Sequence, residues 1–482
     1  MSRILFATSE AAPLVKTGGL ADISSSLPSA LKALGHDVRI VLPAYPSALA
    51  GAGELIRLGG FKLMGHHVTL LEGQMPDSGV KVWLVDAPAL FQREGGPYVD
   101  EQGNDWPDNA ERFTLFCRVI TELAMGRAGL DWCPEVVHGN DWQTGPAIAL
   151  LSLEDGRPAT VFSIHNLAYQ GYFSREDFIA QAIPEALWSP ESMEYYGYWV
   201  MIKGGIAHAD RIATVSPNYA REITTPEFGN GMDALLRHRQ DRLEGILNGV
   251  DTRTWDPEHD PLITANYNLK RLKSKAKNKT ALQRHFGLPQ SDAPVLGLVS
   301  RLVEQKGIDL VLDALPTLLD KPLQVVMLGS GNKYYELACR ELAERYPQQV
   351  GITIGYDETL AHLIEAGADL FVMPSRFEPC GLNQLYSLRY GTPPIVHKTG
   401  GLADTVVHAS KETLADGTAN GFVFEHPTVE GLQWAIGEAL KCRAEQKCWR
   451  QVIANGMNQD VSWTHSAEAY VALYQKARQD RG

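Results

Sequence analysis

The sequence predicts an α/β protein built from two domains, each with a doubly wound parallel sheet. Short apolar runs alternate with helix-length segments along most of the chain, which is the pattern of parallel strands connected by helices. The alternation occurs in two series, one before residue 245 and the other after residue 290. The length of 482 residues is ample for two or more domains.

The first series begins with an apolar run at Ile4–Thr8 and a glycine-containing loop. A segment with helical apolar periodicity follows at Leu20–Leu34 and ends at Gly35. Further strands are predicted at Val38–Leu42, Val80–Val85, Val136–Val137, Thr160–Ile164 and Arg211–Val215. Each is followed by a segment that could be helical, so we expect a parallel sheet.

The second series has strands predicted at Val295–Val299, Gln324–Leu328, Ile352–Ile354, Leu370–Met373 and Pro394–Val396. The segment between the two series, Asn248–Pro261, is rich in Asp, Pro and Thr. We therefore place the domains at residues 1–245 and 246–456. Residues 457–482 are expected to form a C-terminal helix, because apolar side chains recur at helical spacing over Ser466–Arg478. The periodicity does not say which domain this helix covers; we expect the N-terminal one.

The composition excludes several classes of partner. With 44 basic and 57 acidic residues the net charge is -13, which argues against nucleic acid and anionic membranes. No apolar run approaches the ~20 residues of a membrane span, and the first residues lack the features of a secretory signal. The six cysteines form no C-x-x-C pair. We expect a cytoplasmic protein with neither nucleic acid nor membrane as a partner.

A repeated heptapeptide, K-T-G-G-L-A-D, is the most informative internal signal. It occurs at Lys16–Asp22 and again at Lys398–Asp404, once in each predicted domain. In both copies the glycines follow a strand and precede a possible helix, so backbone amides could approach phosphate oxygens. A tight turn would use the same glycines, but two copies in matched contexts favour an anion site. The chain has no Gly-Lys dipeptide, so it contains no Walker A loop.

Two cations follow the predicted strand Val295–Val299, where ligands bind in open α/β sheets. Arg301 and Lys306 there suit a diphosphate, because a departing nucleoside diphosphate builds negative charge that positioned cations stabilise. A surface salt bridge to Glu304 is the alternative interpretation. Gly329–Gly331 lacks the third glycine of the dinucleotide fingerprint, which weakens the case for nicotinamide or flavin; a plain turn is equally compatible with it.

A carboxylate, Glu378, is predicted to lie at the start of a helix that follows the strand Leu370–Met373. Such a carboxylate can accept hydrogen bonds from sugar hydroxyls, while the amides of Cys380, Gly381 and Leu382 supply donors. The alternative is that Glu378 only caps the helix.

Polar side chains also follow two predicted strands of the first domain. Asn140 and Asp141 follow one strand, and His165 and Asn166 follow the next. An isolated histidine is more often structural, but two polar clusters at one sheet edge favour a functional site. The chain has no D-x-D, no H-E-x-x-H and no Cys/His cluster at zinc spacing, so we expect no metal and no resident cofactor.

Taken in order, six motifs resemble those of the bacterial glycogen synthase and plant starch synthase family: K-T-G-G-L, H-G-N-D-W, S-x-H-N, S-R-L-x-x-Q-K-G, F-E-P-C-G-L and the second T-G-G-L. The resemblance implies a GT-B type glycosyltransferase, in which two Rossmann-like domains face a deep cleft. It also implies ADP-glucose as donor and the non-reducing end of an α-1,4-glucan such as glycogen as acceptor, with retention of configuration.

The same resemblance implies roles for individual residues. Glu378, His165, Lys306 and Arg301 would be catalytic, with the two cations neutralising the diphosphate and Glu378 holding the glucose. Substrate-binding positions would be Lys16, Gly18, Thr399 and Gly400 for phosphates, Cys380, Gly381 and Leu382 for glucose, Tyr356 for adenine, Asn140 and Asp141 for the acceptor side, and Asn166.

One position departs from the wider group of retaining transferases, which carry a second Glu eight residues after the first. Here that position is Tyr386, as is typical of the glycogen and starch synthase branch. With a single carboxylate in the motif, a front-face transfer is favoured over a covalent intermediate. The alternatives are a related transferase using UDP-glucose and a small acceptor, or a non-catalytic glucan-binding protein.

Overall fold

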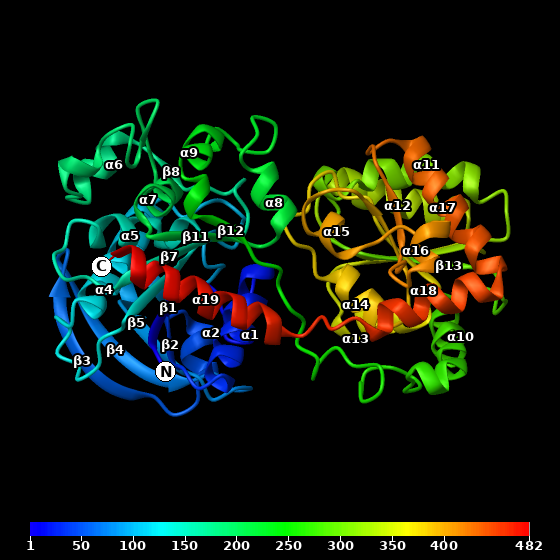
Figure 1. Ribbon diagram of the computed structural model, residues 1–482, viewed down its shortest axis with the longest axis horizontal. Coiled ribbons are helices and arrows are strands. Elements are labelled where there is room, and N and C mark those ends of the chain that lie inside the picture. The colour runs from blue at the N-terminus through cyan, green and yellow to red at the C-terminus, as the bar shows by residue number, and fades with distance from the viewer. Residues whose placement is uncertain (482) are drawn as a thin grey trace. The chain divides into compact units, whose positions relative to one another are not determined.

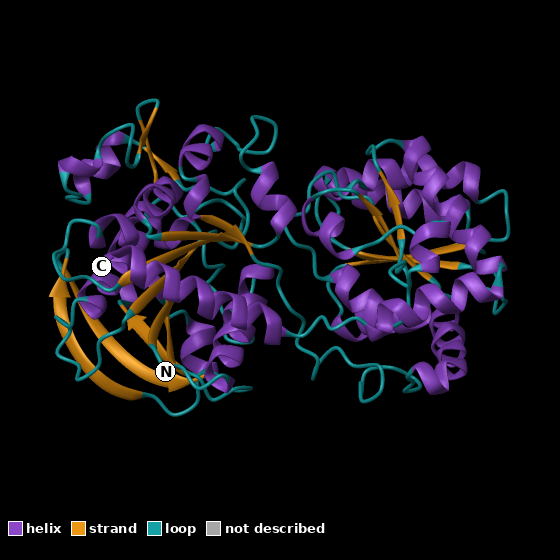
Figure 2. Ribbon diagram, viewed as in Figure 1, coloured by secondary structure: helices purple, strands orange, loops and turns teal. Residues whose placement is uncertain are grey.

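The computed structural model describes residues 1–481, which form two compact units. One unit comprises residues 1–249 together with the helix that starts at Trp463, and the other comprises Val250–Ser462. The chain passes from one unit to the other after residues 249 and 462, a few residues beyond the boundaries expected after residues 245 and 456. In both units a central sheet is covered by helices on its two faces (Figures 1 and 2).

The first unit contains a nine-stranded sheet with the order β12-β11-β7-β6-β1-β2-β5-β4-β3. Its strands are β1 Arg3–Ala7, β2 Asp37–Pro43, β3 Ile56–Leu63, β4 His66–Gln74, β5 Lys81–Asp86, β6 Val136–Asn140, β7 Ala159–Ile164, β11 Arg211–Thr214 and β12 Leu243–Gly245. A separate three-stranded sheet has β8 Tyr172–Phe173, β9 Glu194–Tyr195 and β10 Tyr198–Val200. Every strand predicted for this unit is confirmed, to within a residue or two except at β6.

The expectation of a wholly parallel first sheet is wrong at one edge. Strands β3 and β4 pair antiparallel with each other, and β4 pairs antiparallel with β5. Side chains of β3 are exposed or half-buried along its whole length, and Gly59 and Gly60 interrupt the strand. A strand of this kind has no continuous apolar run, which is why it was not predicted.

The helices of the first unit pack on both faces of the large sheet. They are α1 Gly19–Ala33, α2 Pro46–Gly51, α3 Pro88–Phe91, α4 Asn109–Ala124, α5 Gly145–Leu151, α6 Arg175–Ala180, α7 Met201–His208, α8 Pro217–Glu222, α9 Asp233–His238 and α19 Trp463–Arg481. The predicted helix at Leu20–Leu34 is confirmed as α1.

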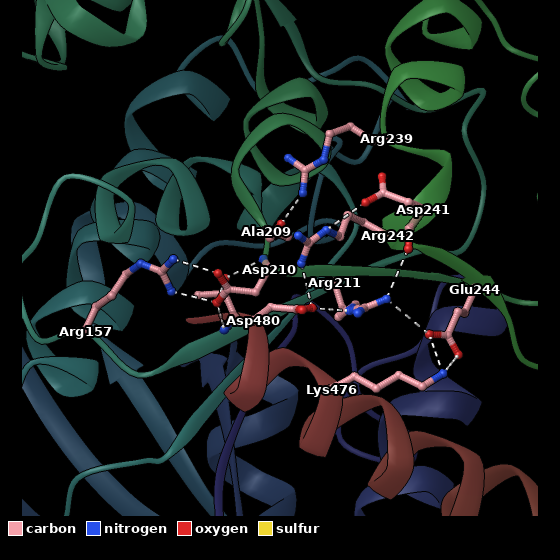
Figure 3. A network of polar contacts seen from close by, with 11 residues as sticks. Arg157, Ala209, Asp210, Arg211, Arg239, Asp241, Arg242, Glu244, Lys476 and Asp480 are labelled. Atoms are coloured by element: carbon pink, nitrogen blue, oxygen red, sulfur yellow. Dashed lines mark hydrogen bonds and ion pairs between the residues drawn. The ribbon is translucent and has the colours of Figure 1, made fainter. Parts of the chain in front are cut away.

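The terminal helix α19 is anchored to the first unit by apolar and ionic contacts. Its apolar stripe packs against α1 and β7, with Tyr470, Leu473 and Tyr474 buried. Near its end, Asp480 lies 2.5 Å from the Arg211 guanidinium and 2.6 Å from that of Arg242 (Figure 3). The helix begins at Trp463 rather than at residue 457, because α18 of the second unit continues to Asn458.

The second unit contains a six-stranded parallel sheet with the order β15-β14-β13-β16-β17-β18. Its strands are β13 Val295–Val299, β14 Gln324–Gly329, β15 Val350–Ile354, β16 Leu370–Met373, β17 Pro394–His397 and β18 Phe422–Phe424. Its helices are α10 Lys275–His285, α11 Ile308–Leu318, α12 Lys333–Arg345, α13 Glu358–Gly367, α14 Asn383–Arg389, α15 Gly400–Thr405, α16 Lys411–Ala415, α17 Val429–Ala444 and α18 Gln446–Asn458. The five strands predicted here are confirmed. A disulfide between Cys442 and Cys448, which no C-x-x-C search detects, joins α17 to α18.

Candidate active site

In the first unit, His165 is held at the carboxyl end of β7 by its neighbour Asn140 at the end of β6. The side chain of Asn140 donates through Nδ2 to the carbonyl of Ala7, at 2.9 Å, so its Oδ1 points the other way. That oxygen lies 2.9 Å from His165 Nε2, which must therefore carry the hydrogen. The opposite nitrogen, Nδ1, is buried and has no hydrogen-bond partner among the described residues.

The electrostatics of His165 follow from this burial. Removal from water lowers the pKa of His165 to about 3, so the ring is neutral at pH 7. The Nδ1 lone pair can then accept a hydrogen bond, for example from a sugar hydroxyl. The buried ring is therefore suited to orienting a substrate hydroxyl, and it is not a general acid at neutral pH.

Asp141 is held in a strained backbone conformation, with φ of +55°. Its Oδ1 accepts a hydrogen bond from the backbone N–H of His165, at 2.8 Å. Desolvation raises the pKa of Asp141 to about 7, although the amides of His165 and Asn166 oppose that rise. The side chain of Asn166 turns toward its own loop, where Oδ1 accepts from the amide of Ala168.

The raised pKa of Asp141 predicts a pH effect on stability. A folded-state pKa above the unfolded value of 3.8 means that stability present at low pH is lost as the pH rises toward 7. Asp141→Asn removes this titration. Between pH 5 and pH 8 we expect the wild type to lose about 2–3 kcal/mol more stability than the variant, read as a difference in Tm. The exposed Asp155→Asn variant should behave like the wild type; equal pH dependence in Asp141→Asn would contradict the assignment.

Sequence reasoning missed Glu10, which organises the first K-T-G-G-L loop. Its buried carboxylate accepts from the amide of Thr17 at 2.6 Å, from the amide of Gly18 at 3.2 Å and from the Tyr98 hydroxyl at 2.6 Å. The expected phosphate contact of the Gly18 amide is thus made to a protein carboxylate in this structure. Lys16 pairs with Asp22 at 2.7 Å. A Cβ added to Gly18 would meet no atom within 4 Å, so this glycine borders open space.

In the second unit, Lys306 and Glu378 form an ion pair. Lys306 Nζ lies 2.5 Å from Glu378 Oε2, which also accepts from the Ser375 hydroxyl at 2.9 Å. The carboxylate is almost completely buried, with Glu378 only 7% exposed. Neither Lys306 nor Arg301 makes the salt bridge to Glu304 that was the alternative interpretation of these two cations. The geometry places a half-buried cation and a buried anion side by side in the loops that follow β13 and β16.

Backbone contacts hold the Lys306 and Glu378 loops together. The amide of Arg376 donates to the carbonyl of Gln305, at 2.8 Å. Gly307 has φ of +67°, and a Cβ there would lie 2.2 Å from the carbonyl oxygen of Pro374. The glycine that ends S-R-L-x-x-Q-K-G therefore allows the Lys306 turn to approach the Glu378 loop.

Glu378 does not cap a helix, because α14 begins at Asn383 with Leu382 as its N-cap. The second T-G-G-L copy instead packs on the Glu378 loop. Gly400 has φ of +44°, and the Gly401 amide donates to the carbonyls of Glu378 and Pro379, both at 3.1 Å. The second T-G-G-L copy therefore supports the Glu378 loop, and the Gly401 amide already has its hydrogen-bond acceptors in that loop.

The remaining predicted site residues of the second unit differ in their exposure. Arg301 is exposed and reaches Gln305, at 3.3 Å. Cys380 is buried, Gly381 has φ of +70°, and Thr399 precedes α15. Tyr356 is 77% exposed in the loop after β15.

Two further features are absent from residues 1–481. No group of three or more His, Cys, Asp or Glu side chains within these residues is suited to holding a metal ion. No helix in the same range has the length and hydropathy of a membrane span.

Comparison with known proteins gives a consistent result for the whole chain. Residues 3–238 match the family model of the starch synthase catalytic domain, and residues 280–456 match that of glycosyl transferases group 1. A glycogen synthase of Thioalkalivibrio sulfidiphilus is 56% identical over 98% of this chain and 99% of its own. The chain belongs to the glycogen and starch synthase family. Glycogen synthase 1 of Methylococcus capsulatus is 54% identical over 98% and 96% of the two chains.

Comparison with solved structures shows the same fold in other proteins. The catalytic domain of starch synthase IV from Arabidopsis thaliana, bound to ADP and acarbose, superposes with a TM-score of 0.88 at 31% identity, over 99% of both chains. A sucrose-phosphate synthase from Thermosynechococcus elongatus has a TM-score of 0.60 at 16% identity, over 99% of both chains, which shows the fold alone. This synthase family member is thus a glycosyltransferase of GT-B type, as expected from its motifs.

Proposed function

We propose that this chain is a glycogen synthase that transfers glucose from ADP-glucose to the non-reducing end of an α-1,4-glucan with retention of configuration. The ion pair Lys306–Glu378, in a chain whose relatives are glycogen synthases, carries the proposal. A cation beside a sugar-binding carboxylate suits a glucose linked to a diphosphate. The ADP and acarbose of the starch synthase IV structure support the choice of donor base and glucan acceptor.

In this proposal each charged group stabilises one part of the donor. Lys306 and Arg301 neutralise the diphosphate as its bond to glucose breaks, which stabilises the transition state. Glu378 accepts hydrogen bonds from glucose hydroxyls, and His165 Nδ1 accepts one from the reacting sugar. Further contacts are assigned to Lys16, Gly18, Thr399 and Gly400 for phosphates, to Cys380, Gly381 and Leu382 for glucose, to Tyr356 for adenine, and to Asn140 and Asp141 for the acceptor side. Asn166 is assigned to substrate binding.

Retention is proposed to arise from front-face transfer. The position of a second carboxylate is taken by Tyr386, whose ring stacks on Trp255 with centroids 3.8 Å apart. The bond from glucose C1 to the phosphate oxygen breaks, the bond from C1 to the acceptor oxygen forms on the same face, and the acceptor's proton passes to the departing phosphate. A glycosyl-enzyme adduct trapped in intact-protein mass spectrometry would contradict this mechanism.

We further propose that transfer needs no resident cofactor and no divalent cation, because Lys306 and Arg301 can supply the positive charge. Glucose incorporation into glycogen from ADP-glucose should therefore proceed at full rate in EDTA.

The same assay separates the alternative functions. Activity with UDP-glucose and a small acceptor, but not with ADP-glucose and glycogen, would assign a sister transferase. Binding of glycogen without any transfer would indicate a glucan-binding protein. The proposed location is cytoplasmic.

A further inference from the structure

Three exposed tyrosines gather on the small sheet of the first unit. Tyr172 lies on β8 and is 49% exposed, Tyr198 lies on β10 and is 55% exposed, and Tyr196, in the turn between β9 and β10, is 86% exposed. β10 pairs with both of the other strands. The rings of Tyr172 and Tyr198 are 6.2 Å apart, in an edge-to-face arrangement. We call these three residues the tyrosine platform; β8 is labelled in Figure 1.

The backbone at Tyr196 is unfavourable for a tyrosine. Tyr196 and Gly197 have φ of +48° and +83°, as in the two-residue hairpin turns that favour Asn-Gly. A bulky residue carries an energetic cost in this conformation. The exposed ring recovers little of that cost by burial. Among the described residues, the only ring contact of Tyr196 is an edge-to-face one with its neighbour Tyr195, with centroids 4.7 Å apart, and the ring stays 86% exposed. An exposed aromatic kept at an unfavourable turn position points to a ligand.

The platform rests on a rigid aromatic base that it shares with the acceptor-side residues. On the inner face of β10, Trp199 is fully buried and packs on Phe173, with ring centroids 5.6 Å apart. Phe173 in turn lies 6.1 Å from Trp142, the residue after Asp141. The loop that begins at Asn166 leads directly into β8. The platform is thus linked by packing to Trp142, next to the acceptor-side residue Asp141, and by sequence to the loop of the substrate-binding residue Asn166.

The chemistry of the platform suits a neutral polyol. The segments 166–173 and 194–200 carry a single charged residue, Glu194, and its carboxylate accepts from the Gly197 amide at 2.7 Å. Tyrosine rings offer flat apolar faces that can stack on the C–H faces of sugars, with hydroxyls for hydrogen bonds, at a low cost in conformational entropy. Apart from Glu194, these segments offer no charge for a nucleotide or an ionic partner.

We propose that the tyrosine platform binds the α-1,4-glucan acceptor at glucose units away from the reacting end, and so holds a long polymer near the site. The proposal rests on the proposed function for the identity of the glucan. It predicts that long and short acceptors depend differently on the platform: glycogen spans both places, whereas a maltotriose occupies only the reacting end.

The test compares glycogen binding and kinetics in a variant with Tyr172→Ala, Tyr196→Ala and Tyr198→Ala. We expect glycogen affinity in gel electrophoresis to weaken at least 10-fold, and KM for glycogen to rise similarly. KM for ADP-glucose and turnover of maltotriose should stay unchanged. Trp434→Ala, which removes an exposed aromatic of α17 in the other unit, serves as the matched control and should bind like the wild type. Unchanged glycogen affinity in the triple variant would overturn the proposal.

A second variant separates binding from folding. Tyr196→Asn should raise Tm, because asparagine tolerates the turn, while it weakens glycogen binding. If the triple variant instead converts an oligomer to a monomer in light scattering, the platform is an interface between copies and the proposal is wrong. A wild type that binds glycogen through the platform but transfers nothing from ADP-glucose would refute the proposed function and leave the platform standing.

Discussion

Replacing Glu378 with alanine should lower kcat by at least ~100-fold. The carboxylate is buried against Lys306 and Ser375, so its removal takes away the group assigned to the glucose hydroxyls and leaves a cation without its partner. Both effects act on the same step, because the sugar and its diphosphate must be held together while their bond breaks. The measurement is steady-state incorporation of glucose into glycogen at saturating ADP-glucose.

The control for Glu378→Ala is Glu438→Ala. Glu438 also pairs with a lysine, Lys441 at 2.6 Å, but on the surface of α17. Exposed pairs of this kind contribute little, so this variant should retain wild-type kcat and Tm. Turnover of Glu378→Ala within threefold of the wild type would remove Glu378 from the site.

Replacing Lys306 with alanine should have an effect of the same size, at least ~100-fold in kcat. The ammonium group is assigned to the charge that develops on the departing diphosphate, and in the resting structure it also balances Glu378. Because the two residues act as one unit, the double variant Lys306→Ala/Glu378→Ala should be little worse than either single variant.

Lys441→Ala is the matched control for the lysine, since Lys441 is the exposed partner of Glu438. Strictly additive losses in the Lys306→Ala/Glu378→Ala variant would show that the ion pair is not a functional unit. Wild-type turnover by Lys306→Ala would contradict the diphosphate assignment itself.

The strands that could be predicted are those buried on both faces. In β13 and β16 every position is apolar or glycine and nearly every one is buried, so the run of residues marks the strand directly. The antiparallel edge strand β3 and the short strands β8 and β9 expose much of their length. Their position is decided by pairing with a neighbour, which leaves little local signal in the sequence.

Site residues could be predicted where they follow a recognisable strand in the sequence. They were harder to predict where contacts between distant parts of the chain determine what the residue does. Lys306 and Glu378 were each identified from the strand before them, but their pairing joins residues 72 positions apart in the chain. Glu10 was missed because its partners Thr17 and Tyr98 are brought to it by the fold. The position of Glu10 shortly after β1, at the sheet edge that carries Asn140 and His165, is the signal that would have found it.

The anchoring of α19 on the first unit has a consequence for synthesis of the chain in the cell. The helix that covers α1 and β7 leaves the ribosome only after all of residues 250–462 have been made. At about 5–20 residues per second, the first unit waits roughly 10 to 40 s for Tyr470, Leu473 and Tyr474. During that interval its His138 lacks the Tyr474 hydroxyl that it contacts at 2.8 Å in the finished protein. The nascent first unit therefore displays the apolar surface of α1 and β7 that α19 later covers, which is a natural target for a ribosome-associated chaperone.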